Sequence, residues 1–151
     1  ILVFPKPWWR ESGLTGRSIS SYGQFNATMD SSPEDGSLGV LTLFSSSMSG
    51  ILLGKTESES ERVALALKWL EGFNSGPIPE PLLAKSVNWN AEPFSQGGYS
   101  AVRTLGSKMP IAELFESRDG LHFAGTESAT EWRSFMEGAL QSSERVVENI
   151  K

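Results

Sequence analysis

The residues that could do chemistry gather near the C-terminal end of the chain. Residues 121–124 are expected to be a short strand, Gly125 opens a turn, and a helix is expected over roughly 134–150. A helix N-terminus presents unpaired amides and a partial positive charge, so this joint suits a negatively polarised ligand. Strand–glycine–helix joints are also common as purely structural features, and on spacing alone that interpretation stays open.

Two glycines and two apolar side chains would shape such a site. Gly125 and Gly138 have no side chain, so a flat cofactor could approach the backbone closely there. Phe135 and Met136 supply apolar surface at the same place. A flat, partly anionic cofactor would fit this pattern, but spacing alone favours the purely structural interpretation.

Composition excludes several other kinds of chemistry. The chain of 151 residues has no cysteine, which excludes disulfides, thiolate metal sites and a cysteine nucleophile. Its single histidine, His122, excludes His-rich zinc sites, and no metal site is predicted. The net charge of -5, with scattered basic residues, argues against nucleic acid as a partner. No apolar run approaches the ~20 residues that a membrane-spanning helix needs.

The elements that must position these residues are mixed. The best helix signal is at 58–73, where Ser58 and Glu61 have capping-box spacing and apolar residues recur every 3.6 positions. The Ser-rich stretch 45–49 is predicted to be a loop, 90–108 is loop-like, and Pro110 opens a short helical turn. In the C-terminal helix one face is apolar except for a serine, and it consists of Met136, Leu140, Ser143, Val147 and Ile150. Strands are predicted at 1–4, 17–22, 24–29, 38–44 and 82–89.

Two blocks of residues carry a family resemblance. The first is Phe123-Ala124-Gly125-Thr126-Glu127-Ser128-Ala129-Thr130-Glu131-Trp132, continued by Phe135-Met136-Glu137-Gly138-Ala139 and Glu144-Arg145. The second is Asn88-Trp89, Glu92-Pro93 and Ser95-Gln96-Gly97-Gly98-Tyr99. Both blocks and their spacing closely resemble the C-terminal signature of the flavin-containing monoamine oxidase family. A weaker match around Trp8-Trp9 and Asp35-Gly36 extends the resemblance over nearly the whole chain.

The resemblance implies a fold and a division of the chain. The chain is expected to be an α+β fragment of a two-domain, FAD-dependent protein of the glutathione-reductase-like type. Residues 1–88 would be part of the substrate-binding domain, with a mixed sheet. Residues 89–151 would be the C-terminal strand and helix of the FAD domain, with an aromatic cage. The chain begins with Ile1 and has no G-x-G-x-x-G unit, so we expect a longer protein around it and expect the fragment alone to be inactive.

The resemblance also assigns residues to roles. Two aromatic rings that sandwich the amine correspond to Tyr99 and Phe135, and Phe135 stands where the family commonly has Tyr. Gly98 stands where animal monoamine oxidases carry a flavin-linked Cys, so FAD is expected to bind non-covalently. The residues expected to contact the cofactor are Trp89, Gly98, Gly125, Thr126, Glu127, Phe135 and Met136.

The function implied is oxidative deamination of primary amines by FAD and dioxygen, giving an aldehyde, ammonia and hydrogen peroxide. A polyamine or L-amino-acid oxidase is the nearest alternative, with Arg103 and Arg133 as candidate carboxylate clamps. A non-catalytic remnant is the alternative from a different class. An intracellular location, cytoplasmic or organellar, is expected, and a homodimer is compatible with the sequence, which does not determine the assembly.

Overall fold

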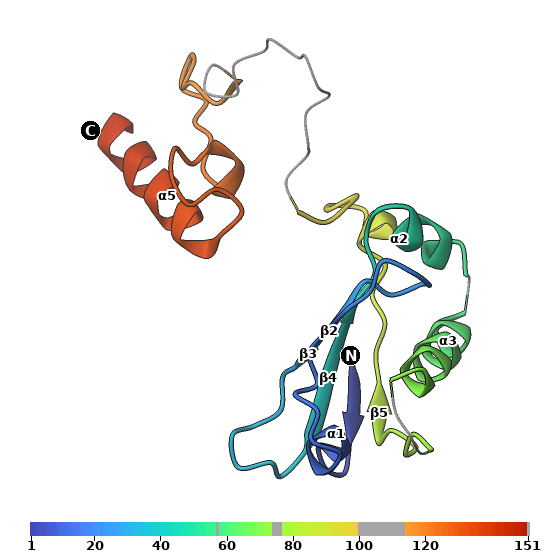
Figure 1. The fold of residues 1–151 in the computed structure, drawn as a ribbon. Coiled ribbons are helices and arrows are strands. Elements are labelled where there is room, and N and C mark those ends of the chain that lie inside the picture. The colour runs from blue at the N-terminus through green and yellow to red at the C-terminus, as the bar shows by residue number, and fades with distance from the viewer. Residues whose placement is uncertain (57, 74–76, 100–113, 151) are drawn as a thin grey trace. The chain divides into compact units, whose positions relative to one another are not determined.

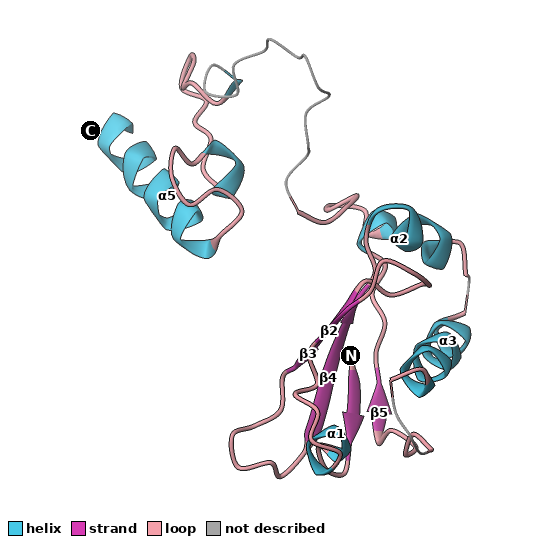
Figure 2. Ribbon diagram, viewed as in Figure 1, coloured by secondary structure: helices cyan, strands magenta, loops and turns pink. Residues whose placement is uncertain are grey.

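The structure is a computed structural model that describes residues 1–56, 58–73, 77–99 and 114–150. The chain divides into two compact units, Ile1–Gly97 and Gly98–Lys151, and each is described by itself. Figure 1 shows the first unit as a sheet with helices beside it, and the second as the surroundings of helix α5. In Figure 2 the strands, in magenta, belong to the first unit.

One five-stranded sheet organises the first unit. In spatial order its strands are β2 (Ser18–Ile19), β3 (Ala27–Asp30), β4 (Gly39–Phe44), β1 (Leu2–Phe4) and β5 (Leu83–Ala84). All four pairings are antiparallel. The α+β class is confirmed, but the pairing differs from the mixed sheet that was expected. Because β2, β3 and β4 follow one another through loops that reverse the chain, antiparallel pairing results without a crossover.

The strand predictions succeed best for the central strands. Those at 1–4 and 38–44 match β1 and β4 within one residue at each end. The predictions at 17–22 and 82–89 shrink to the two-residue strands β2 and β5. Both lie at the edges of the sheet, where only one neighbour is available for pairing.

The helix predictions succeed where apolar residues recur at helical spacing. Helix α3 (Glu59–Glu71) is confirmed, and the backbone amide of Glu61 donates to Ser58 Oγ over 3.2 Å. The loop predicted at 45–49 is wrong from Ser47 onward, because α2 spans Ser47–Gly54. Its sequence is apolar nearly all round and contains two glycines, so it has no amphipathic stripe to reveal it. The short helix α1 (Trp8–Glu11) was not predicted either.

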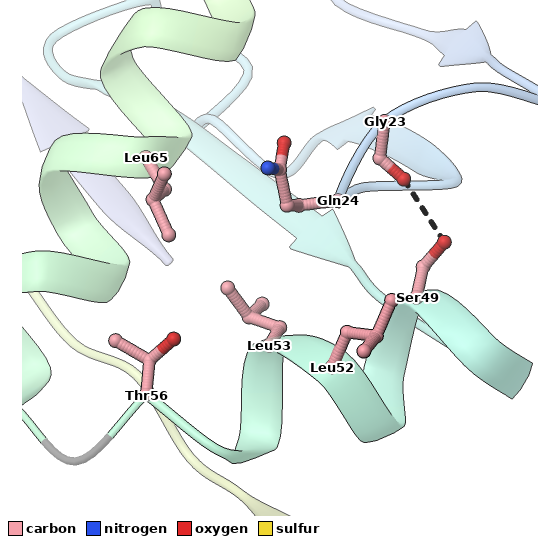
Figure 3. Close-up of a pocket in the computed structure, with 7 residues that line it drawn as sticks. All are labelled: Gly23, Gln24, Ser49, Leu52, Leu53, Thr56 and Leu65. Carbon is pink, nitrogen blue, oxygen red and sulfur yellow. Dashed lines mark hydrogen bonds between the residues drawn. The ribbon is translucent and has the colours of Figure 1, made fainter.

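An open hollow of about 360 Å³ lies between α2, α3 and the loop before β3. Figure 3 shows Leu53 and Leu65 in the hollow, and the hydroxyl of Ser49 donating to the Gly23 carbonyl over 2.9 Å. None of its lining residues is charged. They are Gly23, Gln24, Ser49, Leu52, Leu53, Thr56 and Leu65.

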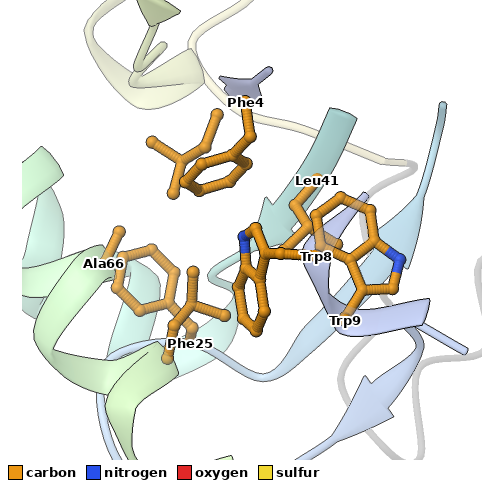
Figure 4. Packing of buried hydrophobic residues seen from close by; sticks show 8 residues of the cluster. Phe4, Trp8, Trp9, Phe25, Leu41 and Ala66 are labelled. Atoms are coloured by element: carbon orange, nitrogen blue, oxygen red, sulfur yellow. The ribbon is translucent and has the colours of Figure 1, made fainter. Parts of the chain in front are cut away.

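The core of the first unit is aromatic and lies between one face of the sheet and α3. Phe4, Trp8 and Trp9 meet edge to face, with ring centroids 5.4 to 6.1 Å apart (Figure 4). Ala66 and Leu70 of α3 belong to the same buried cluster. The register places Leu2 opposite both Leu41 and Ala84, so these three side chains share the covered face.

The opposite face of the sheet is also largely apolar. Val3 pairs with Val40 and with Leu83, so these side chains point away from the core. By the same register that face carries Ile19, Ala27, Met29, Thr42 and Phe44. Ile19, Met29, Phe44 and Leu83 are exposed there. An apolar patch of this kind on a sheet marks a surface that contacts a ligand or other protein segments.

Asp30 joins the sheet to the aromatic core through hydrogen bonds. Its carboxylate accepts from Trp9 Nε1 and Arg10 Nε, both over 2.9 Å, and from the amide of Ser32 over 2.8 Å. Burial alone would raise the pKa of this carboxyl, but the hydrogen bonds from Ser32, Trp9 and Arg10 outweigh it and lower the pKa to about 2. The carboxylate is 14% exposed, so water screens these bonds little.

Replacement of Asp30 by Asn should therefore destabilise the first unit in a pH-dependent way. The folded pKa lies below the ordinary 3.8, so the charged form stabilises the fold above about pH 4 and this stabilisation disappears as the pH falls toward 2. We expect Asp30→Asn to lower the free energy of unfolding by about 2 kcal/mol at pH 7, and by little near pH 2. Urea unfolding at several pH values measures this. Glu11→Gln, which breaks the exposed Lys6–Glu11 pair, is the control and should be nearly neutral. Equal losses for Asp30→Asn at pH 7 and pH 2 would contradict the assignment.

Candidate functional site

The turn before the C-terminal helix has a backbone shape that favours glycine. Gly125 has φ +131° and ψ 162°, a conformation that side chains other than hydrogen disfavour. A short 3₁₀ turn, η2 (Thr126–Ser128), follows, and the amide and hydroxyl of Ser128 both donate back to the Gly125 carbonyl, over 3.1 and 2.9 Å. The strand predicted at 121–124 is wrong: only Leu121 pairs, in an isolated bridge with Arg118. The described residues give the run no sheet to join.

Helix α5 (Met136–Ile150) supports this turn with its small and polar residues. Gly138 and Ser142 are buried, and Ser142 Oγ accepts from the Gly125 amide over 2.8 Å. Arg145 Nη2 lies 3.1 Å from the Phe123 carbonyl and 3.2 Å from Ser128 Oγ. The helix itself is confirmed, beginning two residues later than predicted.

The apolar face of α5 lies on the other side. Met136 is 88% exposed, and Leu140, Val147 and Ile150 are exposed as well. The periodicity thus identified the helix correctly, but this face is not the one that packs against η2. Small and polar residues make that contact, and hydrophobic periodicity does not find them.

Two features of the turn fit a bound cofactor. Thr126 Oγ1 is buried and has no hydrogen-bond partner within the described part of the chain. A buried hydroxyl without a partner is costly, so such an atom points to a missing ligand group. At Gly125 the position of a side chain would meet only Glu127 Oε2, 3.4 Å away, so the backbone is open to a close approach. The residues present therefore suit a cofactor with hydroxyl or phosphate oxygens.

Phe135 lies just before α5, in a strained segment. Trp132 has φ 51° and Ser134 has φ 71°, both in the left-handed region that residues other than glycine seldom occupy. The rings of Trp132 and Phe135 meet edge to face with centroids 6.1 Å apart, and Phe135 is 63% exposed. Trp132 is quoted in the family block but was not predicted as a site residue. Its place beside Phe135 is the signal that could have found it.

The upstream block is described separately. Trp89 begins the 3₁₀ turn η1 (Trp89–Ala91) and is exposed, while the Asn88 side chain bridges the Asn90 amide and the Gly54 carbonyl. Gly98 is exposed, and Tyr99 is 82% exposed with φ 61°.

The aromatic cage expected from Tyr99 and Phe135 stays a prediction. The two residues stand on either side of residues 100–113, which lie outside the described structure. The predicted helical turn opened by Pro110 and the candidate clamp Arg103 fall in that same range.

Among the residues that are described, no cluster of three or more His, Cys, Asp or Glu side chains could hold a metal ion. None of the described helices is long and apolar enough to cross a membrane.

Comparison with known proteins decides the family. The model of the flavin-containing amine oxidoreductase family matches residues 1–151. The chain belongs to this family. A probable flavin-containing monoamine oxidase A of Dictyostelium discoideum is 32% identical over 100% of the chain and 33% of its own length. An L-amino acid dehydrogenase of Synechocystis is 28% identical over 99% of the chain and 32% of its own length.

A solved structure agrees in fold. Wild-type putrescine oxidase with bound putrescine superposes with a TM-score of 0.84 at 25% identity, covering 99% of this chain and 33% of that one. The chain therefore spans about a third of the length of the relatives that it matches. The resemblance predicted from the two C-terminal blocks is confirmed, together with the expected α+β fold class.

The contact between α5 and the preceding loop gives a test of the site's architecture. A side chain at Gly138 would collide with the Trp132 carbonyl oxygen and would lie 3.0 Å from Ala129 Cβ. We expect Gly138→Ala to destabilise the protein by about 1–3 kcal/mol, because backbone atoms must shift to admit the methyl group. Thermal or urea unfolding measures the change. Helix propensity alone predicts the opposite sign, a gain of about 1 kcal/mol. Glu137→Ala, at an exposed position of the same turn, is the control, and a stabilised Gly138→Ala protein would contradict the close packing.

Proposed function

We propose that the complete protein is an FAD-dependent oxidase of primary amines, to which this chain contributes one wall of the substrate site and one wall of the flavin site. The supporting observation is the Gly125–Thr126–Glu127 turn, with its open backbone and the unpartnered Thr126 hydroxyl. Membership of the flavin-containing amine oxidoreductase family gives that turn its expected ligand. The products would be an aldehyde, ammonia and hydrogen peroxide.

The flavin side of the proposed site comes from the C-terminal unit. Thr126 and Glu127 would face the ribityl and diphosphate part of FAD, and Phe135 and Met136 would contribute the surface beside the ring. The chemistry that FAD would supply is the acceptance of two electrons from the amine, and dioxygen would then take these electrons from the reduced flavin. Trp89 and Gly98 would add contacts from the upstream block. Because residue 98 is Gly and the chain has no cysteine, no thioether to flavin can form here.

The substrate side is proposed to include residues 1–88. The uncovered face of the sheet presents Val3, Val40 and Met29, an apolar surface suited to the carbon skeleton of an amine. Tyr99 and Phe135 would flank the amine itself. An aromatic face tolerates a cationic or neutral amine without forming a directional hydrogen bond to its lone pair. Phe135 offers such a face without the hydroxyl of a tyrosine.

An L-amino-acid substrate is the second candidate, and Arg133 is the observation that favours it. Its Nε is buried without a hydrogen-bond partner among the described residues, and its Nη2 makes only a long contact of 3.4 Å with the Ala129 carbonyl. A guanidinium in this state could bind a substrate carboxylate by donating hydrogen bonds to its oxygens. The Synechocystis relative named an L-amino acid dehydrogenase makes this class worth testing.

The experiment starts from the complete protein, purified with FAD. We expect a yellow protein whose flavin enters the supernatant on denaturation, and whose visible absorption bleaches anaerobically on addition of a primary amine. Phenethylamine and phenylalanine form a matched pair of probes that differ by one carboxylate, and putrescine tests diamines. Faster bleaching by phenylalanine, abolished by Arg133→Met, would favour the second candidate. Colourless protein in saturating FAD would favour a non-catalytic remnant and defeat the proposal.

The aromatic cage makes a separate prediction. Removal of the ring in Tyr99→Ala should lower kcat/KM for amines by about tenfold or more, because a desolvated amine–ring contact is worth about 2 kcal/mol. Tyr99→Phe keeps the ring and should stay within about threefold of the wild type. Steady-state peroxide production measures both variants, with the flavin content checked by absorbance. Equal losses in the two variants would show that the hydroxyl matters rather than the ring face.

A further inference from the structure

We infer that Ser142 and Arg145 of α5, together with Ser128, form a clamp that holds the Gly125–Glu127 turn in its flavin-binding shape. The inference rests on the proposed function, because it takes the turn to be a flavin contact. The three side chains are positioning residues: Ser142 and Ser128 bond to the backbone of Gly125, Arg145 bonds to the backbone on either side of the turn, and none of them is expected to touch the cofactor.

Ser142 fixes the amide at the start of the turn. The residue is 1% exposed, and its hydroxyl donates its only hydrogen to the Ala139 carbonyl over 2.8 Å. The lone pairs that remain accept from the Gly125 amide, also over 2.8 Å. Gly125 has the φ of +131° at which the backbone turns, so this bond constrains the one residue with the most conformational freedom.

Ser128 bonds to a carbonyl within the turn, and Arg145 bonds to the carbonyls on either side of it. The Ser128 hydroxyl lies 2.9 Å from the Gly125 carbonyl oxygen. Arg145 Nη2 lies 3.1 Å from the carbonyl of Phe123, before the turn, and 3.4 Å from that of Ser128, after it. One guanidinium therefore joins both ends of a six-residue segment. The Gly125 amide and the carbonyls of Phe123, Gly125 and Ser128 are thus bonded within the unit, while the Thr126 hydroxyl keeps its unused bonding capacity.

The composition of the contact separates this clamp from ordinary helix packing. The face of α5 directed at the turn carries Gly138, Ser142 and Arg145, at helical spacing of four and three residues. The apolar residues of the same helix lie exposed on another face. Directional bonds to specific backbone atoms fix geometry, whereas apolar burial chiefly supplies stability.

A pair of neighbouring serines provides a matched test. Ser142 and Ser143 both donate to the Ala139 carbonyl, over 2.8 and 2.9 Å, but only Ser142 bonds to the turn. We expect Ser142→Ala in the complete protein to raise the Kd for FAD about tenfold, because the Gly125 amide loses its buried partner. The Gly125 amide should also exchange its hydrogen faster in the apoprotein. Ser143→Ala should change neither quantity.

The readouts separate positioning from general stability. FAD titration of the apoprotein by fluorescence gives Kd, amide exchange reports on Gly125, and thermal unfolding of the apoprotein gives Tm. A lower Tm for Ser142→Ala with wild-type Kd and wild-type exchange would overturn the inference. If Ser142→Ala does not fold, Ser128→Ala tests the other side of the clamp: a raised Kd supports it and an unchanged Kd overturns it. Wild-type protein that binds no FAD would defeat the proposed function itself, whereas equal FAD binding by wild type and Ser142→Ala would defeat only the clamp.

Discussion

The close approach of α5 to the backbone before it is the constraint on which the C-terminal unit depends. Gly138 sits so near the Trp132 carbonyl that any side chain would collide with it. Only at this separation can a residue one turn further along, Ser142, reach the Gly125 amide with a side chain as short as serine. The same approach brings α5 against the segment in which Trp132 and Ser134 have positive φ, directly before Phe135. The absence of a side chain at Gly138 thus lets α5 lie close both to the Gly125 turn and to the segment before the Phe135 ring.

The sheet of the first unit is stabilised by different interactions from those of the C-terminal unit. Its sheet is only one layer, and its strands at the edges are two residues long, so backbone pairing alone leaves it weakly held. The aromatic cluster of Phe4, Trp8 and Trp9 covers one face, and Asp30 of β3 bonds to that cluster by accepting from Trp9 Nε1. Arg10 and the Ser32 amide donate to the same carboxylate. The second face can then stay uncovered and apolar, which is what a substrate wall requires.

The sequence predicted those elements whose signal is periodic or local. Helix α3 was found because its cap and its stripe agree, and α5 because its apolar residues repeat every turn. The same periodicity hid what α5 does: the residues that hold the turn are a glycine, a serine and an arginine, which carry no hydrophobic signal. Helix α2 was missed because its apolar residues form no stripe and two glycines interrupt it. Site residues such as Thr126 and Phe135 came from the family blocks, since no spacing rule assigns a flavin contact to a threonine.

The absence of a cysteine gives the geometry of the turn added weight in the proposed holoenzyme. A flavin that is not bonded to the protein is held only by the surplus of contacts over the cost of ordering the groups that make them. If the turn were mobile in the apoprotein, ordering it would cost free energy each time FAD binds, and the affinity would be lower by that amount. Ser142, Ser128 and Arg145 order the Gly125 backbone before any cofactor arrives, with bonds internal to the unit. The unpartnered hydroxyl of Thr126 is then left, already in place, for the ligand. Preorganisation of this kind is the physical alternative to a covalent link at residue 98.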